Sequence, residues 1–179
     1  MAWGFAFYLI AVGLESIPPL SVVNIRLIVG AFTLYAVMHW QGYSLPIGWG
    51  WWARFALLAT VGNLIPFSLI SWGQTHISSA QAGLLMALMP ISTMLLAHFF
   101  VHGEEFTLRR LAGVLLGLLG VSVLIGGEVL SVTADNTLLG QFAVLAATFS
   151  YASNAVYTKR IPVINTLVVA TGSLIAGSV

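Results

Sequence analysis

A hairpin of two long apolar runs constrains this chain more strongly than any other feature. It covers residues 76–127 and reads HISSAQAGLLMALMPISTMLLAHFFVHGEEFTLRRLAGVLLGLLGVSVLIGG. Each run holds about 20 residues, which as a helix rising ~1.5 Å per residue spans the ~30 Å hydrocarbon core of a bilayer. A short polar segment, residues 102–110, separates the runs. Because helices pair their backbone polar groups internally, as lipid requires, the sequence predicts an all-α, polytopic membrane helix bundle.

Composition leads to the same fold class. Hydrophobic residues make up 59% of the chain and charged residues only 6%, against roughly 25% charged in soluble domains. So few charges indicate a lipid bilayer as the environment, and the net charge of +1 argues against nucleic acid as a partner. The absence of cysteine excludes thiolate metal sites and cysteine nucleophiles. Since the sequence has no catalytic-triad pattern or glycine-rich phosphate loop either, it predicts neither an enzyme nor a cofactor.

Apolar segments separated by turns and polar loops are expected to form the membrane helices. The proline pair at positions 18 and 19 ends the first of them, because proline cannot donate a helical hydrogen bond. Both ends of the chain fall within apolar segments, so we expect a piece of a longer protein or a chain that a partner completes. The expected helices are residues 1–14, 20–40, 51–73, 78–101, 108–125, 138–158 and 163–179.

The charged residues predict an orientation in the membrane. When alternate loops are assigned to alternate sides, the acidic residues Glu15, Glu128 and Asp135 fall on one side. Most of the basic residues fall on the other side, which the positive-inside rule identifies as cytoplasmic. These basic residues are Arg54, Arg109, Arg110, Lys159 and Arg160.

Two prolines lie well inside predicted helices. Pro66 and Pro90 each remove one backbone hydrogen bond, which is expected to free the carbonyl groups of Gly62 and Met86. Transporters use such breaks as binding sites where a cavity satisfies the freed backbone. The alternative is a simple packing kink, since proline is fairly common in membrane helices.

Polar neighbours of these prolines favour a cavity over a kink. Asn63 lies three residues before Pro66, and Ser92 and Thr93 follow Pro90. Polar side chains within membrane helices usually face the bundle interior or a wet cavity. We therefore expect a cavity between the third and fourth helices.

Arg26, about two turns into the second predicted helix, has two interpretations. A central membrane arginine costs about 2.5–3.5 kcal/mol on insertion scales, so it faces the bundle or extends to the surface. In the first case its planar guanidinium could hold a substrate carboxylate or phosphate. In the second it would reach the outer surface, toward Glu15.

Two further patterns have weaker functional meaning. His98 and His102 are one helical turn apart and could begin a zinc site, but further ligands are not evident, so an interfacial pair is favoured over a metal site. Gly113, Gly117 and Gly120 form a small-residue strip, which predicts close packing of the fifth helix against another helix.

Several of these motifs together resemble a known family. They are Ser79-Ala80 through Pro90, Gly103-Glu104-Glu105-x-Thr107, and Leu-x-Gly-x-x-Leu-Gly-x-x-Gly-Val over residues 111–121. Weaker matches are Trp3-Gly4, Ile17-Pro18-Pro19, Arg26, and the run from Asn63 to Gln74. That last run is similar to a bacterial subgroup of the same family. The chain thereby resembles the EamA-type transporters of the drug/metabolite transporter superfamily.

The resemblance implies ten helices in two inverted five-helix repeats, with a substrate cavity between them. Residues 1–127 would be the first repeat, and residues 138–179 would begin the second. The implied function is a secondary transporter of the bacterial inner (plasma) membrane, exporting small metabolites such as amino acids by alternating access. This function is compatible with proton coupling. It is also compatible with a homodimer or with a missing C-terminal half as partner.

The alternative is a non-transporting membrane module that packs against a partner through its glycine-rich fifth helix. The expected substrate-binding residues are Trp3, Arg26, Asn63, Met86, Met89, Pro90, Ser92, Thr93, Asn154 and Tyr157.

Overall fold

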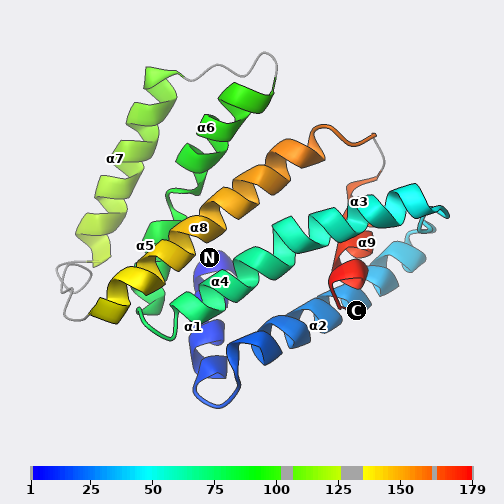
Figure 1. The fold of residues 1–179 in the computed structure, drawn as a ribbon, viewed down its shortest axis with the longest axis horizontal. Coiled ribbons are helices and arrows are strands. Elements are labelled where there is room, and N and C mark those ends of the chain that lie inside the picture. Colours follow the sequence, from blue (N-terminus) through cyan, green and yellow to red (C-terminus); the bar gives the residue numbers. More distant parts are fainter. Residues whose placement is uncertain (1, 102–106, 126–134, 163–164, 179) are drawn as a thin grey trace.

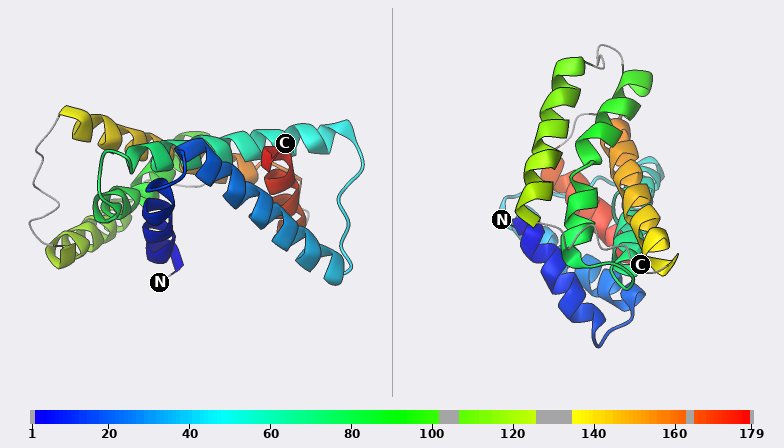
Figure 2. Two further views of the ribbon diagram at one scale, coloured as in Figure 1. Left: turned by 90° about the horizontal axis from the view of Figure 1, so that it is seen from below. Right: turned by 90° about the vertical axis from the view of Figure 1, so that its left-hand side faces the viewer.

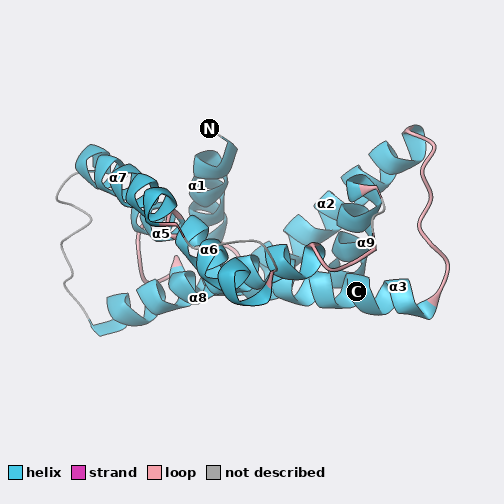
Figure 3. Ribbon diagram, turned by 90° about the horizontal axis from the view of Figure 1, so that it is seen from above, coloured by secondary structure: helices cyan, strands magenta, loops and turns pink. Residues whose placement is uncertain are grey.

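The structure is a bundle of helices. It is a computed structural model that describes residues 2–101, 107–125, 135–162 and 165–178, and these contain no β-strand (Figure 3). The all-α fold class predicted from the hydrophobic pattern is therefore confirmed. In chain order the helices are α1 (Ala2–Leu14), α2 (Pro19–Trp40), α3 (Trp49–Ala59), the π-helix η1 (Thr60–Leu64), α4 (Ile65–Gly73), α5 (Ser79–Met86), α6 (Met89–Phe100), α7 (Leu108–Ile125), α8 (Asp135–Thr158) and α9 (Thr166–Ser178).

Local sequence signals set where several helices begin. Pro19 occupies the first turn of α2, where its missing N–H would have no helical partner. Ser78 starts α5 with a reciprocal capping box. Its hydroxyl accepts from the backbone N–H of Gln81 at 3.2 Å, and its own N–H donates to the Gln81 side-chain oxygen at 3.0 Å.

Three helical spans among the described residues are long and apolar enough to cross a membrane. They are Pro19–Trp40 (22 residues), Trp49–Gly73 (25 residues) and Ser79–Phe100 (22 residues). The last two contain Pro66 and Pro90 and correspond in extent to the predicted helices 51–73 and 78–101. The second span continues from α3 through η1 into α4, and the third is interrupted at residues 87–88, between α5 and α6.

Helix α8 occupies the centre of the packing. It lies against α4, α5 and α6, whereas α9 lies against α2 and α3 (Figure 1). Two edge-on views show α8 and the α3–α4 segment along one side of the molecule, with α7, α1, α2 and α9 extending toward the other side (Figures 2 and 3). A buried apolar cluster forms where α1, α4, α5 and α8 meet, and its members are Phe7, Ile10, Ile70, Ile77, Ala82, Met86, Val144, Ala147 and Tyr151.

Two glycines allow α4 and α8 to cross closely. A β-carbon added to Gly140 would lie 2.9 Å from Cβ of His76 and 3.0 Å from the carbonyl oxygen of Gly73. One added to Gly73 would lie 2.8 Å from Cγ2 of Val144 and 3.0 Å from the carbonyl oxygen of Gly140. Because a backbone carbonyl cannot rotate away as a side chain can, both positions require glycine at this crossing.

The glycine strip on α7 does not have the packing role that we predicted. A β-carbon on Gly113, Gly117 or Gly120 would find no described atom within 4 Å, and these residues are exposed. A strip of small residues indicates that a helix surface is flat enough for close contact, but it does not indicate which helix packs there. In the described part of the chain, glycines elsewhere lie at close contacts instead, among them Gly73 and Gly140.

Candidate functional site

The π-helix η1 opens the backbone just before Pro66. The backbone N–H of Ile65 bonds to the carbonyl of Thr60, five residues earlier, which is the π-helical register. In that register the next donor would be Pro66, which has no N–H, so the unpaired carbonyl is that of Val61. The hydroxyl of Ser150 on α8 donates to this carbonyl at 2.6 Å. The freed carbonyl is thus one residue earlier than the Gly62 carbonyl predicted from a regular α-helix.

The second break lies at residues 87–88. Pro90 occupies the first turn of α6, where a backbone N–H is not needed, so the chain interrupts the helix instead of bending it. Pro90 itself is exposed, whereas Met86 is buried and Met89 packs against the buried cluster. The break therefore brings two of the predicted site residues, Met86 and Met89, to one apolar pocket beside Phe7.

Arg26 contacts aromatic side chains inside the bundle. Its guanidinium carbon lies 4.2 Å from the centre of the Phe67 ring, a cation–π contact between α2 and α4. The Phe67 ring meets the ring of Tyr151 edge-on, with centroids 6.4 Å apart, and Arg26 interacts electrostatically with Tyr151. No carboxylate among the described residues forms an ion pair with Arg26, and its contacts do not include Glu15.

Asn63 and Asn154 come together in a polar pocket of about 190 Å³. Asn63 comes from η1 and Asn154 from α8, and Oδ1 of Asn154 is buried without a hydrogen-bond donor among the described residues. Gly62 makes this approach feasible, because a β-carbon there would lie 2.6 Å from Cγ of Asn154. The other lining residues are Leu58, Thr158, Thr166, Val169, Ala170 and Ser173.

The remaining predicted site residues lie elsewhere. Tyr157 lines a neighbouring pocket of about 140 Å³ together with Asn154. Ser92 is buried and shares a hydrogen bond of 2.9 Å with Thr148, while Thr93 donates to the carbonyl of Met89 at 2.9 Å. Neither Ser92 nor Thr93 lines the pockets described above. The side chain of Trp3 lies outside the described residues.

Several residues that complete these sites had not been predicted from the sequence. Phe67 contacts Arg26, Tyr151 meets the Phe67 ring edge-on, and Ser150 satisfies the freed carbonyl. Tyr151 could have been predicted from the sequence, because it lies three residues before Asn154 and so shares a helix face with it. The predicted histidine pair could not be compared, since His102 lies outside the described residues. The described residues contain no group of three or more His, Cys, Asp or Glu side chains that could hold a metal ion.

An all-helical membrane bundle with an internal arginine and two broken helices has the architecture of a membrane transport protein. The chain belongs to the EamA-like transporter family, which matches residues 1–126. Members of this family are transporters and not enzymes, and the predicted family resemblance is therefore confirmed.

Individual relatives support the same assignment. The chain is 26% identical over 159 residues to the uncharacterized transporter YoaV of Bacillus subtilis, a match covering 89% of this chain and 54% of YoaV. It is 30% identical over 164 residues to a probable amino-acid metabolite efflux pump of Escherichia coli, covering 90% of this chain and 51% of that protein. A solved crystal structure superposes with a TM-score of 0.67 at 24% identity, covering 97% of this chain and 63% of that one. The chain spans about half the length of the curated relatives it matches.

Proposed function

We propose that this chain forms part of a secondary transporter that exports small amphipathic metabolites, such as amino acids, across the inner membrane of a bacterium by alternating access. The observation that carries the proposal is Arg26, an internal cation that lies over the Phe67 ring and forms no ion pair with a described carboxylate. Relatives named as probable amino-acid metabolite efflux pumps agree with such a substrate.

The chemistry of Arg26 favours an anionic group on the substrate. An arginine inside a membrane bundle needs a counter-charge or a polar partner, because desolvating an unpaired charge is costly. The cation–π contact with Phe67 orients the guanidinium. The fork of N–H donors suits a carboxylate, which can accept two of these hydrogen bonds at once. In this proposal the substrate carboxylate is the missing partner.

The two broken helices supply the points at which the bundle could change shape. Helices interrupted near prolines bend more readily than continuous ones, and transporters place such interruptions next to the substrate. We assign residues 1–127 to a first EamA-type repeat and residues 138–179 to the start of a second. Because α8 packs against both α4 and α6, a movement of the second repeat would act on both breaks.

A counterflow assay tests the proposed function. The protein that contains this chain, at its natural length, is reconstituted into proteoliposomes loaded with an unlabelled amino acid, and uptake of the radiolabelled amino acid is measured. We expect accumulation well above that of protein-free liposomes for at least one apolar amino acid. Accumulation at the protein-free level for all twenty amino acids would contradict the proposal.

The membrane orientation gives an independent prediction, which single cysteines can test because these 179 residues contain none. In intact bacterial cells, a cysteine replacing Ser16 in the turn between α1 and α2 should react with a membrane-impermeant thiol reagent. A cysteine replacing Ser44 between α2 and α3 should react only after the cells are opened, because the positive-inside rule places that loop in the cytoplasm. The opposite labelling pattern would refute the orientation.

A second candidate function is a non-transporting module that packs against a partner through α7. The open surface around Gly113, Gly117 and Gly120 favours it, because flat glycine faces suit close helix contact. This surface and the Arg26 site are on different helices, so variants can separate the two functions.

Replacing Gly117 by leucine distinguishes the candidates. Since no described atom lies within 4 Å of a β-carbon at Gly117, Gly117→Leu should leave the helices of this chain folded. If α7 binds a partner or a second copy, the variant should lose that assembly, seen as a lower mass in mild detergent. Gly50→Leu is the matched control, because Gly50 also has open space around it. Identical masses for the wild type and Gly117→Leu would rule out the module function.

A further inference from the structure

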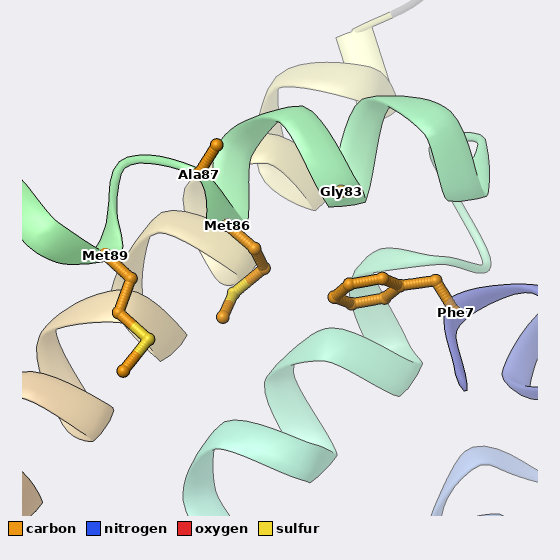
Figure 4. A pocket seen from close by; sticks show the side chains of 5 residues that line it. All are labelled: Phe7, Gly83, Met86, Ala87 and Met89. Carbon is orange, nitrogen blue, oxygen red and sulfur yellow. The ribbon is translucent and has the colours of Figure 1, made fainter. Parts of the chain in front are cut away.

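An apolar pocket lies beside the break between α5 and α6. Its walls come from α1, α5, the break itself and the start of α6, and it is a partly open pocket of about 230 Å³. Figure 4 shows the Phe7 ring facing Met86, with the Met86 and Met89 side chains extending into the same space. An apolar space of this size that stayed empty would forfeit the dispersion contacts of its lining atoms, so it suits an apolar occupant. The lining residues are Phe7, Gly83, Met86, Ala87 and Met89.

One wall of this pocket is fixed and the other is adaptable. The carbonyl of Phe7 accepts a hydrogen bond from Nε2 of Gln74 at 3.0 Å and another from the hydroxyl of Ser79 at 3.4 Å, which ties α1 to α5. Gln74 also donates to Ser79 at 3.1 Å. Met86 and Met89, on the opposite wall, have flexible and polarizable side chains that fit a range of apolar shapes.

The pocket and Arg26 contact the same group of packed residues. Phe7, Met86 and Tyr151 belong to one buried cluster, and Phe67 and Met89 pack against it. Arg26 lies over Phe67 and interacts with Tyr151. A cationic group and an apolar pocket on one cluster match a ligand that carries an anionic group and an apolar side chain.

We propose that this pocket receives the side chain of the amino-acid substrate and makes the transporter selective for branched and aromatic amino acids over alanine and serine. This inference rests on the proposed transport function. At about 230 Å³, the pocket is below the ~300–1,000 Å³ of sites that enclose whole drug-sized ligands, and this suits a single side chain. Arg26 then holds the carboxylate, while the pocket discriminates among side chains.

Filling the pocket tests this inference. The nearest atom to a β-carbon on Gly83 is Cδ2 of Phe7 at 4.0 Å, so the side chain of Gly83→Leu has room to extend into the pocket. Counterflow in proteoliposomes is measured with radiolabelled leucine, phenylalanine and alanine, using the protein at its natural length. Gly83→Leu should lower the leucine-to-alanine and phenylalanine-to-alanine efficiency ratios by about tenfold or more, the usual effect of losing an apolar contact in a specificity pocket. Gly50→Leu, on an open surface, should leave both ratios unchanged.

A second variant covers the case in which Gly83→Leu does not fold. Met86→Ala enlarges the pocket, and it should raise the efficiency for phenylalanine relative to leucine. Either predicted change in ratios supports the inference. If wild-type protein transports these amino acids but the folded variants change all of them equally or not at all, the inference is overturned while the transport function stands. If the wild type transports no amino acid, both are overturned.

Discussion

Replacing Arg26 by glutamine should reduce the apparent affinity for an anionic substrate by about ten- to a hundredfold. A hydrogen bond to a charged group contributes about 1.5–3 kcal/mol, which corresponds to that change in affinity. Arg26→Lys should have a smaller effect, because lysine keeps the charge but loses the bidentate geometry. The measurement is the concentration dependence of counterflow in proteoliposomes that contain matched amounts of folded protein.

Phe67 provides a second, weaker variant of the same site. Its ring orients the guanidinium at 4.2 Å without contributing a charge, so Phe67→Leu should weaken binding only by the cation–π contribution of about 0.5–2 kcal/mol. Wild-type kinetics in Arg26→Gln would contradict the binding role of Arg26 and leave it as a structural residue of α2.

Leucine in place of Gly140 should destabilise the bundle by about 3 kcal/mol, the upper end of the usual range for overpacking. The reason is the crossing of α4 and α8, where a β-carbon on Gly140 would lie within 3.0 Å of a backbone carbonyl oxygen. Gly140→Ala should already cost about 1 kcal/mol, since the β-carbon alone causes the conflict. The fraction of folded protein in detergent and its thermal unfolding midpoint measure the effect.

The control for Gly140 is again Gly50→Leu, which adds the same side chain where no atom lies within 4 Å. It should keep the wild-type unfolding midpoint. If Gly140→Leu and Gly50→Leu unfolded at the same temperature, the close approach of α4 and α8 would be refuted.

The sequence was sufficient to predict the fold class, because 59% hydrophobic residues in runs of membrane length leave few alternatives. Pro66 and Pro90 also marked the two breaks. The freed carbonyl could not be predicted. It depends on the π-helical register before Pro66 and on Ser150, which lies 89 residues further along the chain. A contact of that kind has no local sequence signal.

Glycine contacts show the same limitation. The sequence motif on α7 predicted close packing, but the described glycines at close contacts are others, among them Gly73 and Gly140. Gly73 is flanked one turn away by Leu69 and Ile77, so it belongs to no small-residue repeat. Which glycine lies at a crossing is decided by how two distant helices meet, and a single sequence does not encode that in its local pattern.

The site residues divide in a similar way. Asn63 and Asn154 were predicted as site residues because both are polar residues in apolar helices. The structure places both at one pocket. Ser92 was predicted on the same grounds, but its hydroxyl bonds to Thr148 inside the packing between α6 and α8. Polarity in a membrane helix indicates a partner, whereas the identity of that partner, substrate or protein, depends on the tertiary structure.

The central claim is that Arg26 binds the carboxylate of an amphipathic substrate, and it can be tested most directly by changing both members of the pair. Binding of leucine and of leucinol, which lacks the carboxylate, is measured for the wild type and for Arg26→Gln. If the guanidinium and the carboxylate contact each other, the effects of Arg26→Gln and of replacing leucine by leucinol on the binding free energy are coupled and do not add. We predict that leucine binds the wild type about tenfold or more tightly than leucinol, and that Arg26→Gln removes this difference without weakening leucinol. An equal loss of affinity for leucine and leucinol in Arg26→Gln would contradict the claim.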